Sequence, residues 1–225
     1  MRLGKGRRSQ PTKSIVGVRN CRPSGRQRND GLNAAVETTL GVPMSAFRSG
    51  DPQWQRHFVL GDGWRIFVRP LRPDDDLLVR DLLAHVSKED LRLRFFDSIK
   101  EFSPQFIARL THLDPARAMA FVAIDEVSRD TLGVVRLHTD SSGEAGEYAV
   151  LLRSDLKGRG LGWALMQLII EYAKFKGLSR VYGEILRENS VMLKMCRELG
   201  FAVKTDAEDR GVCDVTLVLA PNPQA

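Results

Sequence analysis

The sequence predicts an α/β (α+β) domain in which helices cover both faces of a central mixed, twisted β-sheet. From Trp64 onward, short apolar runs alternate with segments whose apolar residues recur at helical spacing, and the two kinds follow one another in a mixed order. Apolar residues also make up 43% of the 225 residues, which is sufficient for a sizeable core. We place this domain at residues 58–225.

A strand and three helices are expected to open the domain. The strand "WRIFVRPL" is apolar and is closed by Pro70. The first helix has acids in its first turn, where the helix dipole favours negative charge. The second begins at "SKED", which resembles a capping box, and the third has Ser103 as N-cap with a proline after it. These elements are expected at 64–71, 74–86, 87–96 and 103–113.

Five more strands and two helices are expected to complete the domain. Two apolar runs joined by the polar turn "VSRD" form one strand pair, and a third apolar run follows. The next helix begins at Leu161 and stops at Gly177, and the last helix ends at Gly200, because glycine favours helix C-termini. The strands are expected at 119–126, 131–139, 146–153, 180–187 and 212–220, and the last helix at 188–200.

The net charge of +6 is concentrated at the N-terminus. Residues 1–57 hold eleven Lys and Arg against three acids, so the remaining chain carries a slight negative charge. This segment lacks apolar periodicity, and we expect a disordered, solvated basic extension. A transit peptide or an arm for anionic surfaces remains open. The acidic balance of the folded part argues against nucleic acid as a partner.

Several other classes of protein are excluded by composition. No apolar run approaches the ~18 residues of a membrane span. The cysteines Cys21, Cys196 and Cys213 form no CxxC pair, and the four histidines lack metal-ligand spacing. We therefore expect a cytoplasmic protein with no metal site and no membrane partner.

The stretch "DLKGRGLG" (155–162) lies between an expected strand and an expected helix. Three glycines let the backbone approach an anion closely, the helix N-terminus offers free N–H groups, and Lys157 and Arg159 add positive charge. No Lys-Ser/Thr pair follows, and GxGxxG fails at Trp163, so neither a P-loop nor a dinucleotide fingerprint is present. The stretch predicts a phosphate cradle, with a tight strand–helix turn as the alternative.

The segment "VLLRSDLKGRGLG" (150–162) resembles the acetyl-CoA signature of the GCN5-related N-acetyltransferase (GNAT) family, with Lys157 in the first signature position. "LRENSVMLKMCRELGF" (186–201) is similar to the family's following strand, Asn and helix. "RLRFFDSIKEFS" (92–103) resembles the C-terminal domain of bacterial Pat-type protein-lysine acetyltransferases. The resemblance covers about residues 64–220 and implies the GNAT fold.

The resemblance also implies the activity. We expect an acetyl-CoA-dependent N-acetyltransferase whose acceptor is a primary amine, with a protein lysine favoured. A small-molecule amine acceptor, a non-catalytic CoA-sensing module and a homodimer remain open. The resemblance assigns acetyl-CoA to the backbone of one strand, to the glycine loop and to an Asn. These cofactor-binding residues are Val150, Leu151, Leu152, Lys157, Gly158, Arg159, Gly160, Leu161, Gly162 and Asn189, the last with helix N-cap as its alternative.

Transfer to an amine requires a base, because the free ammonium has a pKa of about 10. Glu147 is the expected catalytic base, since it opens the strand that carries the cofactor. Glu144 is the second choice, and His138 is expected to be structural. Many relatives have a tyrosine acid where this chain has Cys196, whose spacing with neighbouring apolar residues predicts core packing instead.

Overall fold

The computed structural model describes residues 52–220 except 62, 98, 100 and 207–208. The described strands form an eight-stranded sheet in the order β1-β2-β3-β4-β5-β6-β8-β7. All neighbours are antiparallel except β5 and β6, which are parallel. The strands are β1 (Arg56–Leu60), β2 (Trp64–Pro70), β3 (Ala118–Asp125), β4 (Thr131–Thr139), β5 (Ala145–Leu152), β6 (Arg180–Leu186), β7 (Ala202–Thr205) and β8 (Val212–Val218).

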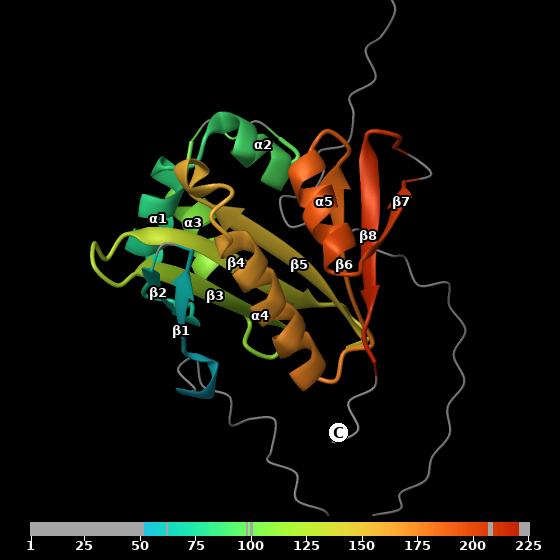
Figure 1. The fold of residues 1–225 in the computed structure, drawn as a ribbon, viewed down its shortest axis with the longest axis horizontal. Coiled ribbons are helices and arrows are strands. Elements are labelled where there is room, and N and C mark those ends of the chain that lie inside the picture. The colour runs from blue at the N-terminus through green and yellow to red at the C-terminus, as the bar shows by residue number, and fades with distance from the viewer. Residues whose placement is uncertain (1–51, 62, 98, 100, 207–208, 221–225) are drawn as a thin grey trace, which may run out of the picture. The chain divides into compact units, whose positions relative to one another are not determined.

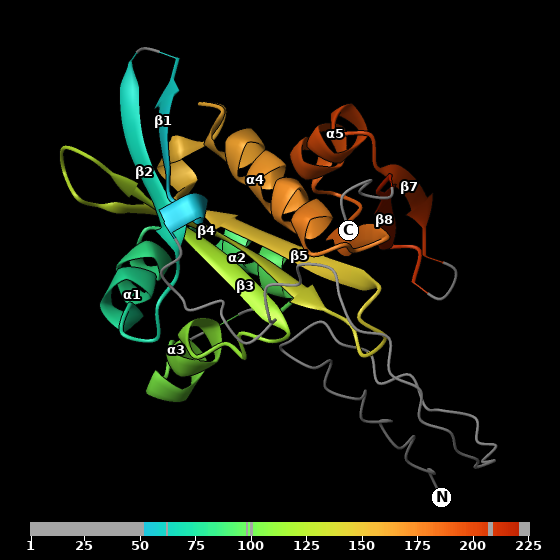
Figure 2. The ribbon, with the colours of Figure 1, turned by 90° about the horizontal axis from the view of Figure 1, so that it is seen from below.

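Helices cover both faces of this sheet, as the sequence predicts. The helices are α1 (Asp76–Ala84), α2 (Lys88–Phe95), α3 (Pro104–Thr111), α4 (Leu161–Phe175) and α5 (Ser190–Glu198). Figure 2 shows α4 and α5 on one face and α1 and α3 on the other. Apolar residues of α4 and α5 form one core cluster with the sheet, and those of α1, α2 and α3 form a second. Because strand side chains alternate, Tyr148 of β5 packs in the first cluster and Leu151 in the second.

Local signals place the helix starts correctly. Ser87 and Ser103 are the N-caps of α2 and α3, and each accepts a hydrogen bond in its first turn. The donors are the Asp90 N–H at 3.1 Å and the Phe106 N–H at 3.2 Å. These bonds satisfy backbone groups that a helix end leaves without an intrahelical acceptor.

The described structure contains two strands that the sequence analysis does not predict, β1 and β7. Ahead of β1, a short 3-10 turn at Pro52–Trp54 buries the Trp54 side chain to 4% exposure. Its ring packs edge-on against Tyr172 and Phe175 of α4, with centroids 5.0 and 5.2 Å apart. The described fold therefore begins ahead of the expected domain boundary at residue 58. Positions 1–51 of the expected extension lie outside the described residues.

The two parallel strands of the sheet pair over a short length. β5 pairs with β6 from Ala145 opposite Arg180 to Glu147 opposite Tyr182. Beyond this point the two strands diverge, which Figure 1 shows as a widening separation between the β5 and β6 ribbons. β5 continues to pair with β4 as far as Leu152. One backbone edge of β5 is thus left without a paired strand in the described part of the chain.

Candidate active site

The glycine loop leads from β5 into the N-terminus of α4. Gly160 is the N-cap of α4 with a φ of +89°, and no side chain caps the helix there. Gly158 has a φ of +78°, and a Cβ on either glycine would meet no atom within 4 Å. The left-handed backbone therefore requires glycine at both positions, and the space that a side chain would occupy is open. This end of α4 suits an anion.

Gly162 has a different role in the same loop. It lies inside α4, and an added Cβ would be 3.2 Å from Cδ1 of Leu152. The absence of a side chain allows α4 to pack closely on β5. Gly162 therefore sets the distance between the helix N-terminus and the strand that precedes the loop.

The two loop cations contact protein groups. The Lys157 ammonium forms an ion pair with the carboxylate of Asp90 on α2. Asp90 also accepts hydrogen bonds from Ser154 Oγ and from Ser87 Oγ, the latter at 3.0 Å. Burial alone would raise the pKa of Asp90, but these three donors lower it. The Arg159 guanidinium stacks on Trp64, with its Cζ 3.9 Å from the ring centroid.

The expected pantetheine strand presents alternate residues to its open edge. The Arg153 N–H donates to the Leu132 carbonyl of the β4 side. The backbone N–H and C=O groups of successive residues in an antiparallel strand point to opposite sides. Those of Leu151 therefore point toward β4, like those of Arg153, whereas those of Val150 and Leu152 point toward β6. An extended ligand at this edge would form backbone hydrogen bonds with Val150 and Leu152. Leu151 would contact such a ligand through its side chain only.

Asn189 is the N-cap of α5, and its Oδ1 accepts a hydrogen bond from the Met192 N–H at 3.2 Å. This is the alternative that the sequence analysis leaves open. A contact between Asn189 and acetyl-CoA stays a prediction.

Glu147 lies at the last paired position of β5 before the strands diverge. It is opposite His138 of β4 and Tyr182 of β6. Its half-buried side chain is on the face of β5 that also presents Ala149 and Leu151. Burial raises the pKa of Glu147 to about 6, against the opposing effects of Arg136 and Arg94. A carboxylate with a pKa near neutrality is suited to accept a proton.

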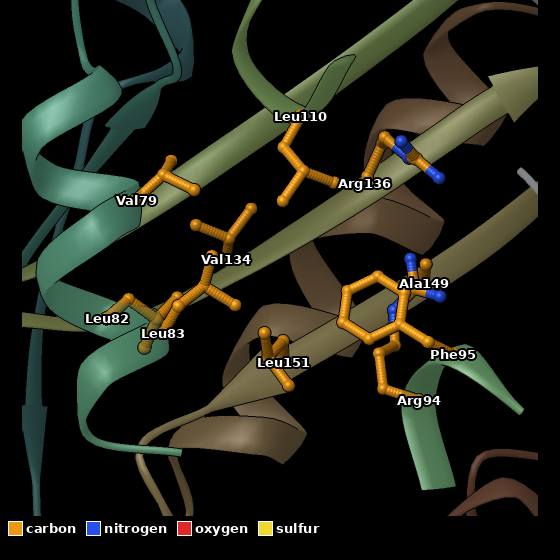
Figure 3. A pocket seen from close by; sticks show the side chains of 10 residues that line it. All are labelled: Val79, Leu82, Leu83, Arg94, Phe95, Leu110, Val134, Arg136, Ala149 and Leu151. Carbon is orange, nitrogen blue, oxygen red and sulfur yellow. The ribbon is translucent and has the colours of Figure 1, made fainter. Parts of the chain in front are cut away.

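A small cavity of about 40 Å³ lies on the same face of the sheet. Figure 3 shows aliphatic side chains of α1 on one side of it and Arg94, Phe95 and Arg136 on the other. The sequence analysis does not identify the two arginines. The sequence does contain a signal for Arg136, because this charged residue interrupts the apolar run "GVVRLHT" of a central strand.

The remaining candidates differ in their surroundings. Cys196 is 0% exposed, and its Sγ lies 3.1 Å from the Tyr148 hydroxyl oxygen. Burial raises the pKa of both groups. Glu144 is exposed in the turn before β5, where its carbonyl accepts from the Ser179 N–H. Burial lowers the pKa of His138.

No helix in the described ranges combines the length and apolar character needed to cross a membrane. The described residues also contain no group of three or more His, Cys, Asp or Glu side chains arranged to bind a metal ion.

Comparisons with known proteins identify the family and support the fold. The chain matches the acetyltransferase (GNAT) family over residues 83–201. Acetyltransferase PA5475 of Pseudomonas aeruginosa is 31% identical over 152 residues, which are 67% of this chain and 82% of that protein. The L-methionine sulfoximine/L-methionine sulfone acetyltransferase of the same species is 37% identical over 57 residues, 25% of this chain and 33% of that enzyme.

Two solved structures extend the comparison. The GNAT domain of S. lividans PAT has a TM-score of 0.68 and 27% identity, and the match covers 75% of this chain and 98% of that domain. RimL, a ribosomal L7/L12 α-N-protein acetyltransferase in complex with coenzyme A, has a TM-score of 0.59 at 12% identity over 73% of this chain and 98% of RimL. The second likeness is one of fold.

Proposed function

The chain belongs to the acetyltransferase (GNAT) family and is an acetyl-CoA-dependent N-acetyltransferase, and on this premise we propose that Glu147 is its general base. The single observation that carries the proposal is the position of Glu147. It is a half-buried carboxyl group with a pKa raised to about 6, located where β5 and β6 diverge and facing the side of the cavity.

We further propose that the loop and β5 hold acetyl-CoA, which supplies an activated thioester. The uncapped N-terminus of α4 and the open space at Gly158 and Gly160 support a pyrophosphate site. The unpaired edge of β5 supports hydrogen bonds from Val150 and Leu152 to an extended pantetheine chain. Lys157 can contribute charge from its place beside Asp90.

Glu147 then accepts the proton that the amine must lose. The amine nitrogen forms a bond to the acetyl carbon, the carbon–sulfur bond breaks, and the amine proton passes to the Glu147 carboxylate. The departing thiolate receives its proton from water in this scheme. The raised pKa and complete burial of Cys196 support packing with Tyr148 in preference to proton transfer.

Two acceptor classes are compatible with this chemistry. A protein lysine is favoured by the sequence, and the likeness to the GNAT domain of S. lividans PAT supports it. A small amine is the second candidate, supported by the shared segment with the L-methionine sulfoximine/L-methionine sulfone acetyltransferase. We place the reaction in the cytoplasm, because the buried cysteines Cys196 and Cys213 are free thiols.

Release of CoA thiol from acetyl-CoA in the presence of an amine tests the function, with acetyl-CoA affinity measured by calorimetry in parallel. An active enzyme binds acetyl-CoA and releases thiol in proportion to acetylated product. A protein that binds acetyl-CoA but releases no thiol with any amine would instead be a CoA-sensing module.

A further inference from the structure

Two arginines meet beside the cavity, and neither forms an ion pair with a carboxylate in the described part of the chain. Arg94 extends from α2 and Arg136 from β4, and both line the cavity (Figure 3). Within the described part of the chain, neither side chain forms a hydrogen bond or an ion pair. The Arg94 guanidinium lies over the Phe95 ring, with its Cζ 4.8 Å from the ring centroid.

Burial disfavours the charged form of both arginines, and the charge of Glu147 offsets this only in part. Burial, and to a smaller extent the neighbouring charge of Arg136, lower the pKa of Arg94 to about 9. Burial also lowers the pKa of Arg136. Both side chains are half-buried, and a guanidinium withdrawn from water is normally paired, because desolvation of an uncompensated charge is costly. Among the described residues, Glu147 is the acid that acts on both arginines, and the proposed function uses it as the base.

The shape of the cavity limits what could supply the missing negative charge. Its volume is about 40 Å³, and a water molecule requires about 10–15 Å³ on this measure. The space is that of about three or four water molecules, which suits a carboxylate group and one or two carbon atoms. The other walls are apolar side chains of α1, α2, α3, β4 and β5, namely Val79, Leu82, Leu83, Phe95, Leu110, Val134 and Leu151.

The position of Glu147 relates the cavity to the reaction. Arg136 is directly opposite Ala149, and Glu147 is two residues from Ala149 on the same face of β5. Diagonal neighbours of this kind have Cα atoms about 7–8 Å apart. A single small molecule can thus place an amine at Glu147 and a carboxylate at the arginines.

We propose that the acceptor is a small amine that carries a carboxylate and a short apolar group, as an apolar α-amino acid does. The inference rests on the proposed function and names its acceptor class. Arg94 and Arg136 bind the carboxylate through charge-assisted hydrogen bonds, which guanidinium groups form in bidentate geometry. The aliphatic walls hold the apolar group, and the amine faces Glu147. A protein lysine has no carboxylate fixed near its side-chain amine and does not use these arginines.

Thiol release should be measured with a panel of apolar α-amino acids and their α-amides at saturating acetyl-CoA. Each amide keeps the amine and side chain but lacks the carboxylate. We expect acetylation of at least one amino acid, with kcat/KM for its amide lower by about 10- to 100-fold. Arg136→Gln should raise the KM for the amino acid by a similar factor. Because Arg136 also lowers the pKa of Glu147, the decisive quantity is the ratio of kcat/KM between the amino acid and its amide in the same variant, which should fall toward one.

Arg92→Gln is the matched control, because Arg92 lies on α2 but pairs with Glu89 and Glu188 at the surface. It should not alter acceptor selectivity. Melting temperature and acetyl-CoA affinity of each variant separate a local effect from misfolding. Arg94→Gln provides a second variant if Arg136→Gln does not fold.

Three outcomes would overturn the inference: equal rates with amino acids and amides, selectivity that Arg136→Gln and Arg94→Gln leave intact, or acetylation of lysine peptides with none of the amino acids. Each of these still requires thiol release with some amine and leaves the acetyltransferase function standing. Absence of thiol release with every amine and peptide would instead contradict the proposed function itself.

Discussion

Replacement of Glu147 by Gln should lower activity and raise stability, because both effects arise from the same desolvated carboxylate. Loss of a general base lowers kcat by about 10²–10⁴-fold at neutral pH. The loss should shrink as pH rises, because more acceptor amine is already deprotonated. In the wild-type protein, kcat/KM should fall tenfold per pH unit below a pKa of about 6, where Glu147 becomes protonated.

The stability effect has a defined sign. The pKa of Glu147 is raised from 4.5 to about 6 in the folded state. Between these values the folded protein holds a proton that the unfolded chain has released, so stability declines as pH rises through this window. The full difference corresponds to about 2 kcal/mol, and partial solvent exposure reduces it to about 1 kcal/mol. Glu147→Gln should thus raise the melting temperature at pH 7.5 by about 2–4 °C.

Three charged groups face Glu147 and belong to the same electrostatic environment. Arg136 of β4 and Arg94 of α2 lower its pKa, and Glu184 of β6 raises it. The melting difference between wild type and Glu147→Gln should disappear below about pH 4.5, because both side chains are then neutral. Glu144→Gln serves as the control, since Glu144 is exposed, and it should match wild type in both assays.

Wild-type turnover by Glu147→Gln at neutral pH would refute the role of Glu147 as base. A variant less stable than wild type at pH 7.5 would refute the desolvation argument, even if its activity were low.

Three further substitutions test other parts of the structure. Gly160→Val should abolish acetyl-CoA binding in calorimetry. Gly177→Val is the control, because Gly177 lies at the other end of α4 with a similar positive φ and open space, and this variant should bind acetyl-CoA normally. Equal affinities of the two variants would contradict the phosphate cradle. Trp54→Ala should lower the free energy of unfolding in denaturant by about 3–5 kcal/mol, and a loss below about 1 kcal/mol would contradict its packing on α4. Cys196→Ala should lower stability by about 1–2 kcal/mol but leave kcat nearly unchanged, and a folded, inactive variant would assign Cys196 a chemical role.

Features that depend on neighbouring residues could be predicted from the sequence. The N-caps Ser87 and Ser103 and the glycine loop before α4 are local signals, and the order of elements from Trp64 onward, apart from β7, follows from apolar periodicity. Strand β1 is the exception near the N-terminus. Trp54, in the 3-10 turn ahead of this strand, lies in a polar segment and packs against α4, more than a hundred residues later.

Contacts between distant elements could not be predicted in the same way. Lys157 has the spacing of a phosphate ligand, but its ion pair joins it to Asp90, 67 residues away. The meeting of Arg94 and Arg136 requires the packing of α2 against β4 and β5, which no local pattern encodes. The fold class was therefore accessible from the sequence, whereas the charge environment of Glu147 was not.

The short pairing of β5 with β6 has a consequence for amide hydrogen exchange. Amides of central strands normally exchange slowly, because a neighbouring strand accepts their hydrogen bonds. At Val150 and Leu152 the amides face the side where β6 has diverged, while the Leu151 amide faces β4. Exchange along β5 should therefore alternate between fast and slow at successive residues in the middle of the sheet. A ligand that completes this edge would slow the fast positions and leave the intervening ones unchanged, so the exchange pattern alone would report how far along β5 the ligand extends.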